Sequence, residues 1–251
     1  MHRLLVETDL LNEERPSLPP AAAKHLKVLR PKQGEEIELF DGRGRWRVYS
    51  AAGGATSSLQ AASQLFHESR TARPLTLFAC VTKGSRWDWT IEKATELGVT
   101  RIVPVISDRT IVRIPAGERE AKRERWQRIA EDAARQSDAR WLPEICAAVD
   151  FKDVMPLVRE TVCFVGALTN PPSPPLLGAV LARMRGDSDL PFAAFIGPEG
   201  DFTPNELSEL LKIAVPTSFG PTILRAETAA IYALSVLTSA KSCELKSQMD
   251  M

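Results

Sequence analysis

Two short loops near the C-terminus of this 251-residue chain combine glycine, proline and a few charged side chains in a way that suits ligand binding. The first, FIGPEGDFTPNEL, spans Phe195 to Leu207, and the second, SFGPTILRAETAAIYAL, spans Ser218 to Leu234. Each reads as an apolar strand, a Gly-Pro turn and the start of a helix. Open α/β sheets bind their ligands at such turns, beyond the carboxyl ends of neighbouring parallel strands. We therefore expect the two loops to form one pocket.

In the first loop, the apolar run from Phe192 to Ile196 predicts a buried strand. Gly197 and Gly200 follow it, and glycine lets a backbone approach a ligand closely. The residues TPNE, from Thr203 to Glu206, are typical of a capped helix start with proline in the first turn. Such a helix start exposes free amide groups and partial positive charge. An ordinary strand-to-helix turn explains the same residues, so this loop alone does not identify a ligand.

In the second loop, Val215 to Phe219 is expected to be a short strand, followed by a turn at Gly220. The apolar residues after Ala226 favour a buried helix, and their longest run is too short to span a bilayer. Arg225 and Glu227 flank the expected helix start. A surface ion pair, or an acidic side chain that complements the helix dipole, would explain these two residues without any chemistry.

Taken together, the two loops resemble the SPOUT class of RNA methyltransferases. Within that class they resemble the family that methylates N3 of a uridine in small-subunit ribosomal RNA. Three further stretches resemble signatures of this family in the same order, namely His25 to Gly44, Thr82 to Thr110, and Arg125 to Ser137. The resemblance thus covers nearly the whole chain.

This resemblance implies an α/β fold, with a SPOUT-type parallel sheet and a C-terminal trefoil knot, a rare exception among otherwise unknotted chains. It implies a small PUA-like β-barrel that binds RNA over residues 1–70, and a methyltransferase domain over residues 71–251. It also implies a homodimer, with ribosomal RNA or the small ribosomal subunit as partner. We expect a cytoplasmic protein with no membrane segment.

The cofactor implied by the resemblance is S-adenosylmethionine, held largely by backbone groups. The expected cofactor-binding residues are Leu168, Thr169, Ile196, Gly197, Pro198, Gly200, Phe219, Gly220, Ile223 and Leu224. Arg225 and Glu199 are the candidate catalytic residues. Arg225 could hold a uridine oxygen and favour the N3 anion. Glu199 could contact the amino group of the cofactor or act as a base, or it could simply fix its own turn.

The candidate RNA-binding residues are Arg3, Lys24, His25, Lys27, Arg30, Lys83, Arg86 and Arg140. A solvated helix face would explain the basic stretch around His25 equally well, and Arg3 could be an exposed arginine without a special role. The formal net charge is zero. Residues 71–140 carry 14 Lys and Arg against 10 Asp and Glu, whereas residues 141–251 carry 8 against 13. An RNA surface is therefore expected on residues 1–140.

Two positions depart from the pattern of the family. Asp201 stands where a second glycine is usual after GPEG, and its carboxylate could weaken contact with RNA phosphates. Ala139 stands where an arginine is usual, with Arg140 one place later, which leaves the role of Arg140 open.

Other segments complete the expected α/β pattern. Apolar runs predict strands at residues 36–40, 46–49, 75–81, 101–106 and 162–168. A helix is expected to end at Leu97. Helical spacing predicts that one face of a further helix is made by Trp126, Ile129, Ala130, Ala133 and Ala134. The four cysteines and three histidines fit no zinc pattern, so no metal site is expected and a reducing compartment is the default.

Two other functions stay open, a SPOUT enzyme that acts on another RNA and a non-catalytic RNA-binding or ribosome assembly protein.

Overall fold

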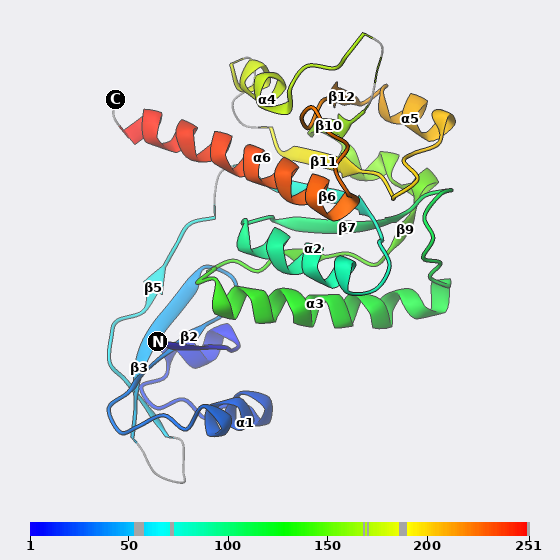
Figure 1. Cartoon of the computed structure of the whole chain (residues 1–251). Coiled ribbons are helices and arrows are strands. Elements are labelled where there is room, and N and C mark those ends of the chain that lie inside the picture. Colours follow the sequence, from blue (N-terminus) through cyan, green and yellow to red (C-terminus); the bar gives the residue numbers. More distant parts are fainter. Residues whose placement is uncertain (53–57, 71–72, 168, 170, 186–189, 250–251) are drawn as a thin grey trace. The chain divides into compact units, whose positions relative to one another are not determined.

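The computed structural model describes residues 1–52, 58–70, 73–167, 169, 171–185 and 190–249, with side chains up to residue 240. The chain divides into two compact units (Figure 1). Unit 1 comprises Met1–Arg70 together with Glu131–Leu142, and unit 2 comprises Thr71–Ala130 together with Pro143–Met251. In the described residues, no helix is both long and apolar enough to cross a membrane.

Unit 1 is built around a small mixed sheet. Its elements are β1 (His2–Leu5), η1 (Thr8–Asn12), α1 (Pro20–Leu29), β2 (Glu36–Phe40), β3 (Arg45–Ala51), β4 (Leu59–Ala61) and β5 (Phe66–His67). β1 pairs with β2 in parallel, while β3 is antiparallel to β2, β4 and β5. The strands predicted at residues 36–40 and 46–49 are confirmed within β2 and β3, which form a hairpin with Phe40 opposite Trp46 next to the turn. Leu4, Leu11, Leu26, Ile37, Leu39 and Tyr49 form most of the core of this unit.

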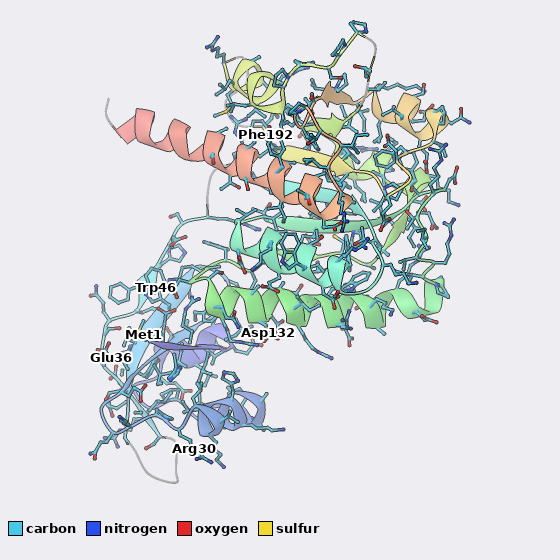
Figure 2. The ribbon with its side chains drawn as sticks, in the orientation of Figure 1. Met1, Arg30, Glu36, Trp46, Asp132 and Phe192 are labelled. Atoms are coloured by element: carbon cyan, nitrogen blue, oxygen red, sulfur yellow. The ribbon has the colours of Figure 1, made fainter. Side chains whose placement is uncertain are left out.

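A buried ionic network crosses unit 1. Glu38, only 1% exposed, accepts a hydrogen bond from the Arg3 guanidinium at 2.7 Å and another from Arg140. Arg3 lies 4.2 Å above the Phe40 ring, and Arg140 lies 4.4 Å above the ring of Trp46, which is labelled in Figure 2. Buried charges are tolerated when they are paired and hydrogen-bonded. The aromatic faces supply further stabilisation for the two cations.

Unit 2 contains a parallel sheet of seven strands in the part of the chain that is described. The strands are β6 (Leu75–Cys80), β7 (Arg101–Ile106), β8 (Glu144–Ile145), β9 (Val149–Asp150), β10 (Val162–Gly166), β11 (Phe192–Ile196) and β12 (Ala214–Thr217). Their order is β12-β10-β11-β6-β7, and both β8 and β9 pair with β7. Every pairing is parallel, as the alternation of strands and helices predicts.

Helices and short helical turns cover this sheet on both faces. They are α2 (Ser85–Glu96), η2 (Ala116–Glu118), α3 (Arg119–Gln136, whose last six residues belong to unit 1), η3 (Phe151–Asp153), η4 (Met155–Val158), α4 (Leu176–Met184), α5 (Pro204–Leu210) and α6 (Ala226–Met249). α6 packs against α2, α4, β6 and β11 (Figure 1). Because successive strand residues point to opposite faces, Leu77 and Ala194 join the core under α2 and α6, while Phe78 and Phe195 stack at 4.7 Å in the core under α5.

The predicted elements are largely confirmed, with differences at strand ends. Strand β12 ends at Thr217, so the expectation of a strand up to Phe219 is wrong. Its partner β10 ends at Gly166, which is paired with Thr217, and Ser218 pairs instead with Pro175 in an isolated parallel bridge. Of the predicted strand at 162–168, residue 168 lies outside the described residues.

The network around Glu38 generates a prediction about stability. Glu38→Ala leaves two guanidinium groups without their shared carboxylate, and breaking a buried ion pair typically costs about 3–5 kcal/mol. We expect the free energy of unfolding to fall by about that amount in a urea titration followed by tryptophan fluorescence. Glu36→Ala, on the same strand but exposed (Figure 2), is the matched control and should change stability by less than about 0.5 kcal/mol. Equal losses in the two variants would contradict this account.

Candidate functional site

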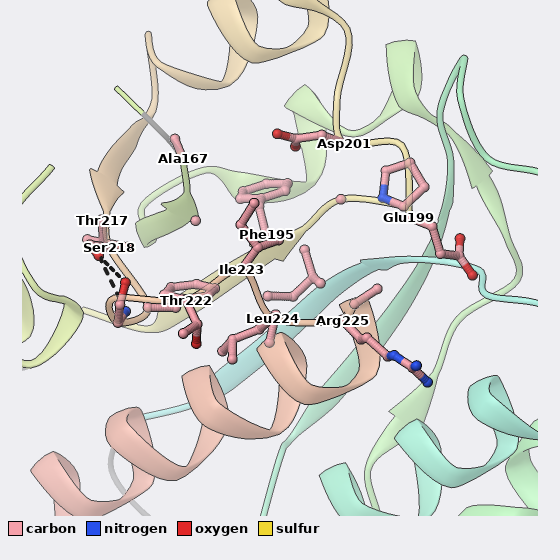
Figure 3. Close-up of a pocket in the computed structure, with 18 residues that line it drawn as sticks. Ala167, Phe195, Glu199, Asp201, Thr217, Ser218, Thr222, Ile223, Leu224 and Arg225 are labelled. Carbon is pink, nitrogen blue, oxygen red and sulfur yellow. Dashed lines mark hydrogen bonds between the residues drawn. The ribbon is translucent and has the colours of Figure 1, made fainter. Parts of the chain in front are cut away.

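A pocket of about 330 Å³ lies beyond the carboxyl ends of β10, β11 and β12 (Figure 3). These three strands are neighbours and parallel, so the segments that follow them meet at one edge of the sheet. The residues that line the pocket are Gly166, Ala167, Phe195, Ile196, Gly197, Pro198, Glu199, Asp201, Thr217, Ser218, Phe219, Gly220, Thr222, Ile223, Leu224, Arg225, Ala226 and Ala229. The expectation that the two loops form one pocket is confirmed.

Residues 197–203, which we call the first pocket loop, connect β11 to α5. A turn closes it, because the Asp201 amide donates to the Pro198 carbonyl oxygen at 2.9 Å. The loop ends in the predicted capping box, in which the Thr203 hydroxyl accepts from the Glu206 amide and the Glu206 carboxylate accepts from the Thr203 amide. The start of α5 is therefore fixed locally by its own sequence.

Residues 218–225, the second pocket loop, connect β12 to α6. The Ser218 hydroxyl accepts from the Gly220 amide at 3.3 Å and donates to the Gly220 carbonyl oxygen at 3.2 Å. The Phe219 ring packs on Tyr232, with ring centroids 5.6 Å apart, and reaches back over Gly166. A Cβ atom at Gly166 would lie 2.7 Å from that ring, so any larger residue at the end of β10 would require the ring to shift.

Most of the predicted cofactor-binding residues line this pocket. Those that do are Ile196, Gly197, Pro198, Phe219, Gly220, Ile223 and Leu224. Thr169 is not among the lining residues, and its hydroxyl donates to the Pro171 carbonyl oxygen at 2.7 Å. Leu168 lies outside the described residues.

Gly200 differs from its neighbours in the same loop. It is not among the lining residues, and a Cβ atom at this position would lie 3.6 Å from the Arg109 side chain. Its role in cofactor binding stays a prediction. Gly166 lines the pocket but is not among the predicted residues, and its only signal in the sequence is a glycine at the end of a buried strand.

The two candidate catalytic residues line the pocket and extend toward the same side of it (Figure 3). Glu199 faces the Arg86 guanidinium at 3.6 Å, and the same guanidinium faces Glu227 at 3.9 Å. Among the described residues, the Arg225 guanidinium has neither an ion-pair partner nor a hydrogen bond. The alternative in which Arg225 and Glu227 form an ion pair is therefore not realised, and Arg225 is available to a ligand.

The candidate RNA-binding residues fall into three groups. Lys24, His25, Lys27 and Arg30 are exposed on α1 and at its C-terminal end, and Lys83 is exposed just before α2 (Figure 2 labels Arg30). Arg86 is exposed but is held between two carboxylates. The expectation that Arg3 and Arg140 bind RNA is corrected. Both guanidinium groups bind Glu38 in the buried network of unit 1, and Arg3 is only 5% exposed. Neither of these two is presented for RNA contact.

The cysteines that the structure describes are unsuited to nucleophilic chemistry. Burial raises the pKa of the Cys80 thiol to about 11 and that of the Cys163 thiol to about 12, so both are protonated at neutral pH. Burial also raises the pKa of Cys146. No cluster of His, Cys, Asp and Glu that could hold a metal ion occurs in the described residues. The charged side chains that line the pocket are Glu199, Asp201 and Arg225, beside backbone groups and the hydroxyls of Thr217, Ser218 and Thr222.

Comparison with known proteins identifies the class. The RNA methyltransferase domain family matches residues 69–238, and the RNA methyltransferase PUA domain family matches residues 18–49. The first match covers well over half of the chain, so this protein belongs to the RNA methyltransferase family. The resemblance seen in the sequence motifs is confirmed at this level.

Individual proteins of known name or structure are also similar to this chain. The chain is 32% identical over 243 residues to ribosomal RNA small subunit methyltransferase E of Synechocystis sp., covering 95% of this chain and 77% of that protein. Ribosomal RNA small subunit methyltransferase E from Neisseria gonorrhoeae, solved with bound S-adenosylmethionine, is similar with a TM-score of 0.78 and 28% identity over 95% of this chain and 97% of its own. A methyltransferase from Legionella pneumophila, solved with the same cofactor, has a TM-score of 0.77 and 27% identity over the same shares of the two chains.

The packing of Phe219 over Gly166 predicts a stability change. Gly166→Ala places a methyl group against the ring, and overpacking of this kind costs about 1–3 kcal/mol. Gly178→Ala is the matched control, because nothing lies within 4 Å of its Cβ position and alanine is the better helix former. It should stabilise the protein by about 0.5–1 kcal/mol. Urea titration of both variants measures the difference, and a neutral Gly166→Ala would show that the ring is not packed as described.

Proposed function

We propose that this protein transfers a methyl group from S-adenosylmethionine to N3 of a uridine in small-subunit ribosomal RNA. Membership of the RNA methyltransferase family supports the reaction class, and the names of the relatives support the ribosomal RNA target. The observation that carries the proposal is the pocket, in which two backbone-rich loops enclose a cavity with Arg225 at its edge, a cation that no described carboxylate engages.

The pocket fits S-adenosylmethionine in size, surface and charge. A cavity of about 330 Å³ is within the range of ligand sites. Backbone groups of both pocket loops can read an adenine edge, and the rings of Phe195 and Phe219 offer apolar surface. The cofactor has a sulfonium, an ammonium and a carboxylate, giving a charge of +1. Glu199, Asp201 and Arg225 give the lining a formal charge of −1, which complements it.

S-adenosylmethionine supplies a methyl group that its sulfonium already activates, so the residues of the protein mainly bind, orient and handle one proton. Loss of the N3 proton leaves negative charge on the uracil ring. The Arg225 guanidinium, which pairs with no carboxylate of the described residues, stabilises this charge more strongly in the transition state than in the neutral ground state.

Glu199 lines the pocket, and two tasks are proposed for it, to hold the ammonium of the cofactor or to accept the N3 proton. Its ion pair with Arg86 at 3.6 Å orients the carboxylate for either task. The two are separable, because loss of an ammonium interaction weakens cofactor binding, whereas loss of a base lowers the methylation rate with cofactor saturating.

We further propose that RNA docks on the exposed basic side chains of α1 in unit 1, Lys24, Lys27 and Arg30, next to His25. Lys83, which is exposed on unit 2, is proposed separately as an RNA contact of that unit. A PUA-like barrel over residues 1–70, a methyltransferase domain over residues 71–251 with a trefoil knot, a homodimeric state and a cytoplasmic location complete the proposal. These rest on the resemblance of the sequence to SPOUT enzymes.

Two experiments test this function together. Calorimetric titration with S-adenosylmethionine should detect binding, and its absence would favour a non-catalytic RNA-binding protein. Mass mapping of ribosomal RNA from a deletion strain should show the loss of one N3-methyluridine from the small-subunit RNA. If the modification is lost from another RNA instead, the enzyme class stands and the target is wrong.

The role of Arg225 predicts a large kinetic effect. Arg225→Ala should lower the single-turnover methylation rate by roughly 10²–10³, the scale of losing one oxyanion donor, and should change cofactor affinity far less. Arg225→Lys should restore only part of the rate, because a point charge cannot replace the planar guanidinium. A near wild-type rate for the alanine variant with saturating RNA and cofactor would assign Arg225 a structural role.

RNA docking on α1 predicts a change in salt dependence. Removing the charges of Lys24, Lys27 and Arg30 should flatten the dependence of RNA affinity on salt by about 0.7–0.9 in log–log slope for each phosphate that these side chains neutralise in the wild type. Cofactor affinity, measured in the same triple variant, should not change. A wild-type slope would mean that this stretch is an ordinary solvated face.

A further inference from the structure

The first pocket loop, residues 197–203, needs support from outside its own sequence. Within the loop, the turn at Pro198 and a hydrogen bond from the Phe202 amide to Asp201 Oδ1, at 2.7 Å, are the local contacts. Asp201 has a φ of 62°, a region that non-glycine residues seldom adopt. A conformation of this kind persists only when surrounding contacts hold it.

Arg109, from the loop that follows β7, holds the middle of the first pocket loop. Its Nη1 atom donates to the Gly200 carbonyl oxygen at 2.9 Å and approaches the Phe202 carbonyl oxygen at 3.5 Å. Glu199 and Asp201 line the pocket, whereas Gly200 between them faces Arg109. Arg109 therefore supports the loop from the side that faces away from the pocket.

Glu206 holds the end of the same loop. It is 6% exposed, and one carboxylate oxygen accepts from the Thr203 amide at 2.8 Å and from the Thr203 hydroxyl at 3.0 Å. The other oxygen accepts from the Asp108 amide at 2.9 Å. The capping box that the sequence predicts thus has a second function, since the same carboxylate ties α5 to the loop after β7.

The loop after β7 is itself fixed. The Ser107 amide donates to the Thr110 hydroxyl at 3.0 Å, and both residues are buried. Arg113 donates to the carbonyl oxygens of Ser107 and Asp108 at 3.0 and 2.8 Å. Arg109 and Glu206 therefore connect the first pocket loop to a rigid anchor.

We propose that Arg109 and Glu206 are positioning residues, which hold the first pocket loop in the conformation that binds S-adenosylmethionine. Neither residue lines the pocket, so both act through the backbone of residues 200–203. This inference rests on the proposed function, because it takes the cofactor to be the ligand of the pocket. Without these two supports, only a fraction of the molecules has the loop in the binding conformation. The apparent association constant for the cofactor is then the intrinsic constant multiplied by that fraction.

The test is calorimetric titration of the full-length protein with S-adenosylmethionine. Arg109→Ala should weaken binding about tenfold, the equivalent of one charge-assisted hydrogen bond. Arg109→Lys should recover part of this loss, because an ammonium group can still donate to the Gly200 carbonyl oxygen. Arg123→Ala is the matched control, since the Arg123 guanidinium donates to Glu120 of the same helix, α3, at 2.7 Å and, in the described residues, makes no hydrogen bond or ion pair with the first pocket loop. Its affinity should equal that of the wild type.

Glu206→Gln gives a second measurement, because an amide group cannot accept hydrogen bonds at both of its ends. It should also weaken cofactor binding, and since Glu206 is buried it should lower the melting temperature. Arg109 is exposed, so Arg109→Ala should leave the melting temperature close to that of the wild type. This pair keeps the test decisive even if the Glu206 variant does not fold.

The outcomes separate the inference from the proposed function. If the wild type does not bind S-adenosylmethionine, the proposed function fails. If the wild type binds it and Arg109→Ala binds it equally well, only the positioning role is overturned. If Arg109→Ala lowers affinity for RNA but not for the cofactor, Arg109 is an RNA contact and the inference is also overturned.

Discussion

The parallel hydrogen bonding of β12, β10 and β11 is the constraint on which the site depends. The register pairs Val165 with Phe195 and Gly166 with Thr217, so the three strands end at one level of the sheet. The chain segments that follow them must therefore meet there, although they are far apart in sequence. A slip of one residue in either pairing would turn Gly166 to the other face of the sheet, away from the Phe219 ring. Because both residues line the pocket, its shape would change.

A pocket built mainly from backbone and apolar surface leaves few groups for chemistry. Within the described part of the chain, three ionisable side chains line it, Glu199, Asp201 and Arg225. The charge of Arg225 is not neutralised by the neighbouring acids, because Arg86 rather than Arg225 faces both Glu199 and Glu227. One arginine thus engages the nearby carboxylates and leaves the other arginine to a ligand, which is the electrostatic condition that stabilisation of an anion requires.

Features that depend on neighbours in sequence were predictable, and features that depend on distant pairings were not. The capping box at Thr203 is local, and sequence alone predicts it. The strand end at Thr217 depends on where β10 ends, which the apolar run up to Phe219 does not reveal. Arg3 and Arg140 look like any other arginine in the sequence, yet both reach Glu38, because residues 131–142 join residues 1–70 in one compact unit.

Asp201 shows how one side chain can change the charge of a site without changing its fold. Its φ of 62° is a conformation suited to glycine, and aspartate is among the few other residues that tolerate it, at a cost of about 1 kcal/mol. The hydrogen bond from the Phe202 amide to the Asp201 side chain offsets part of that cost. Compared with a glycine at this position, the aspartate adds a carboxylate to the pocket lining, which makes the formal charge of the lining negative rather than neutral. A net positive ligand is then favoured over a neutral one of the same shape, because only the former is attracted by the extra charge.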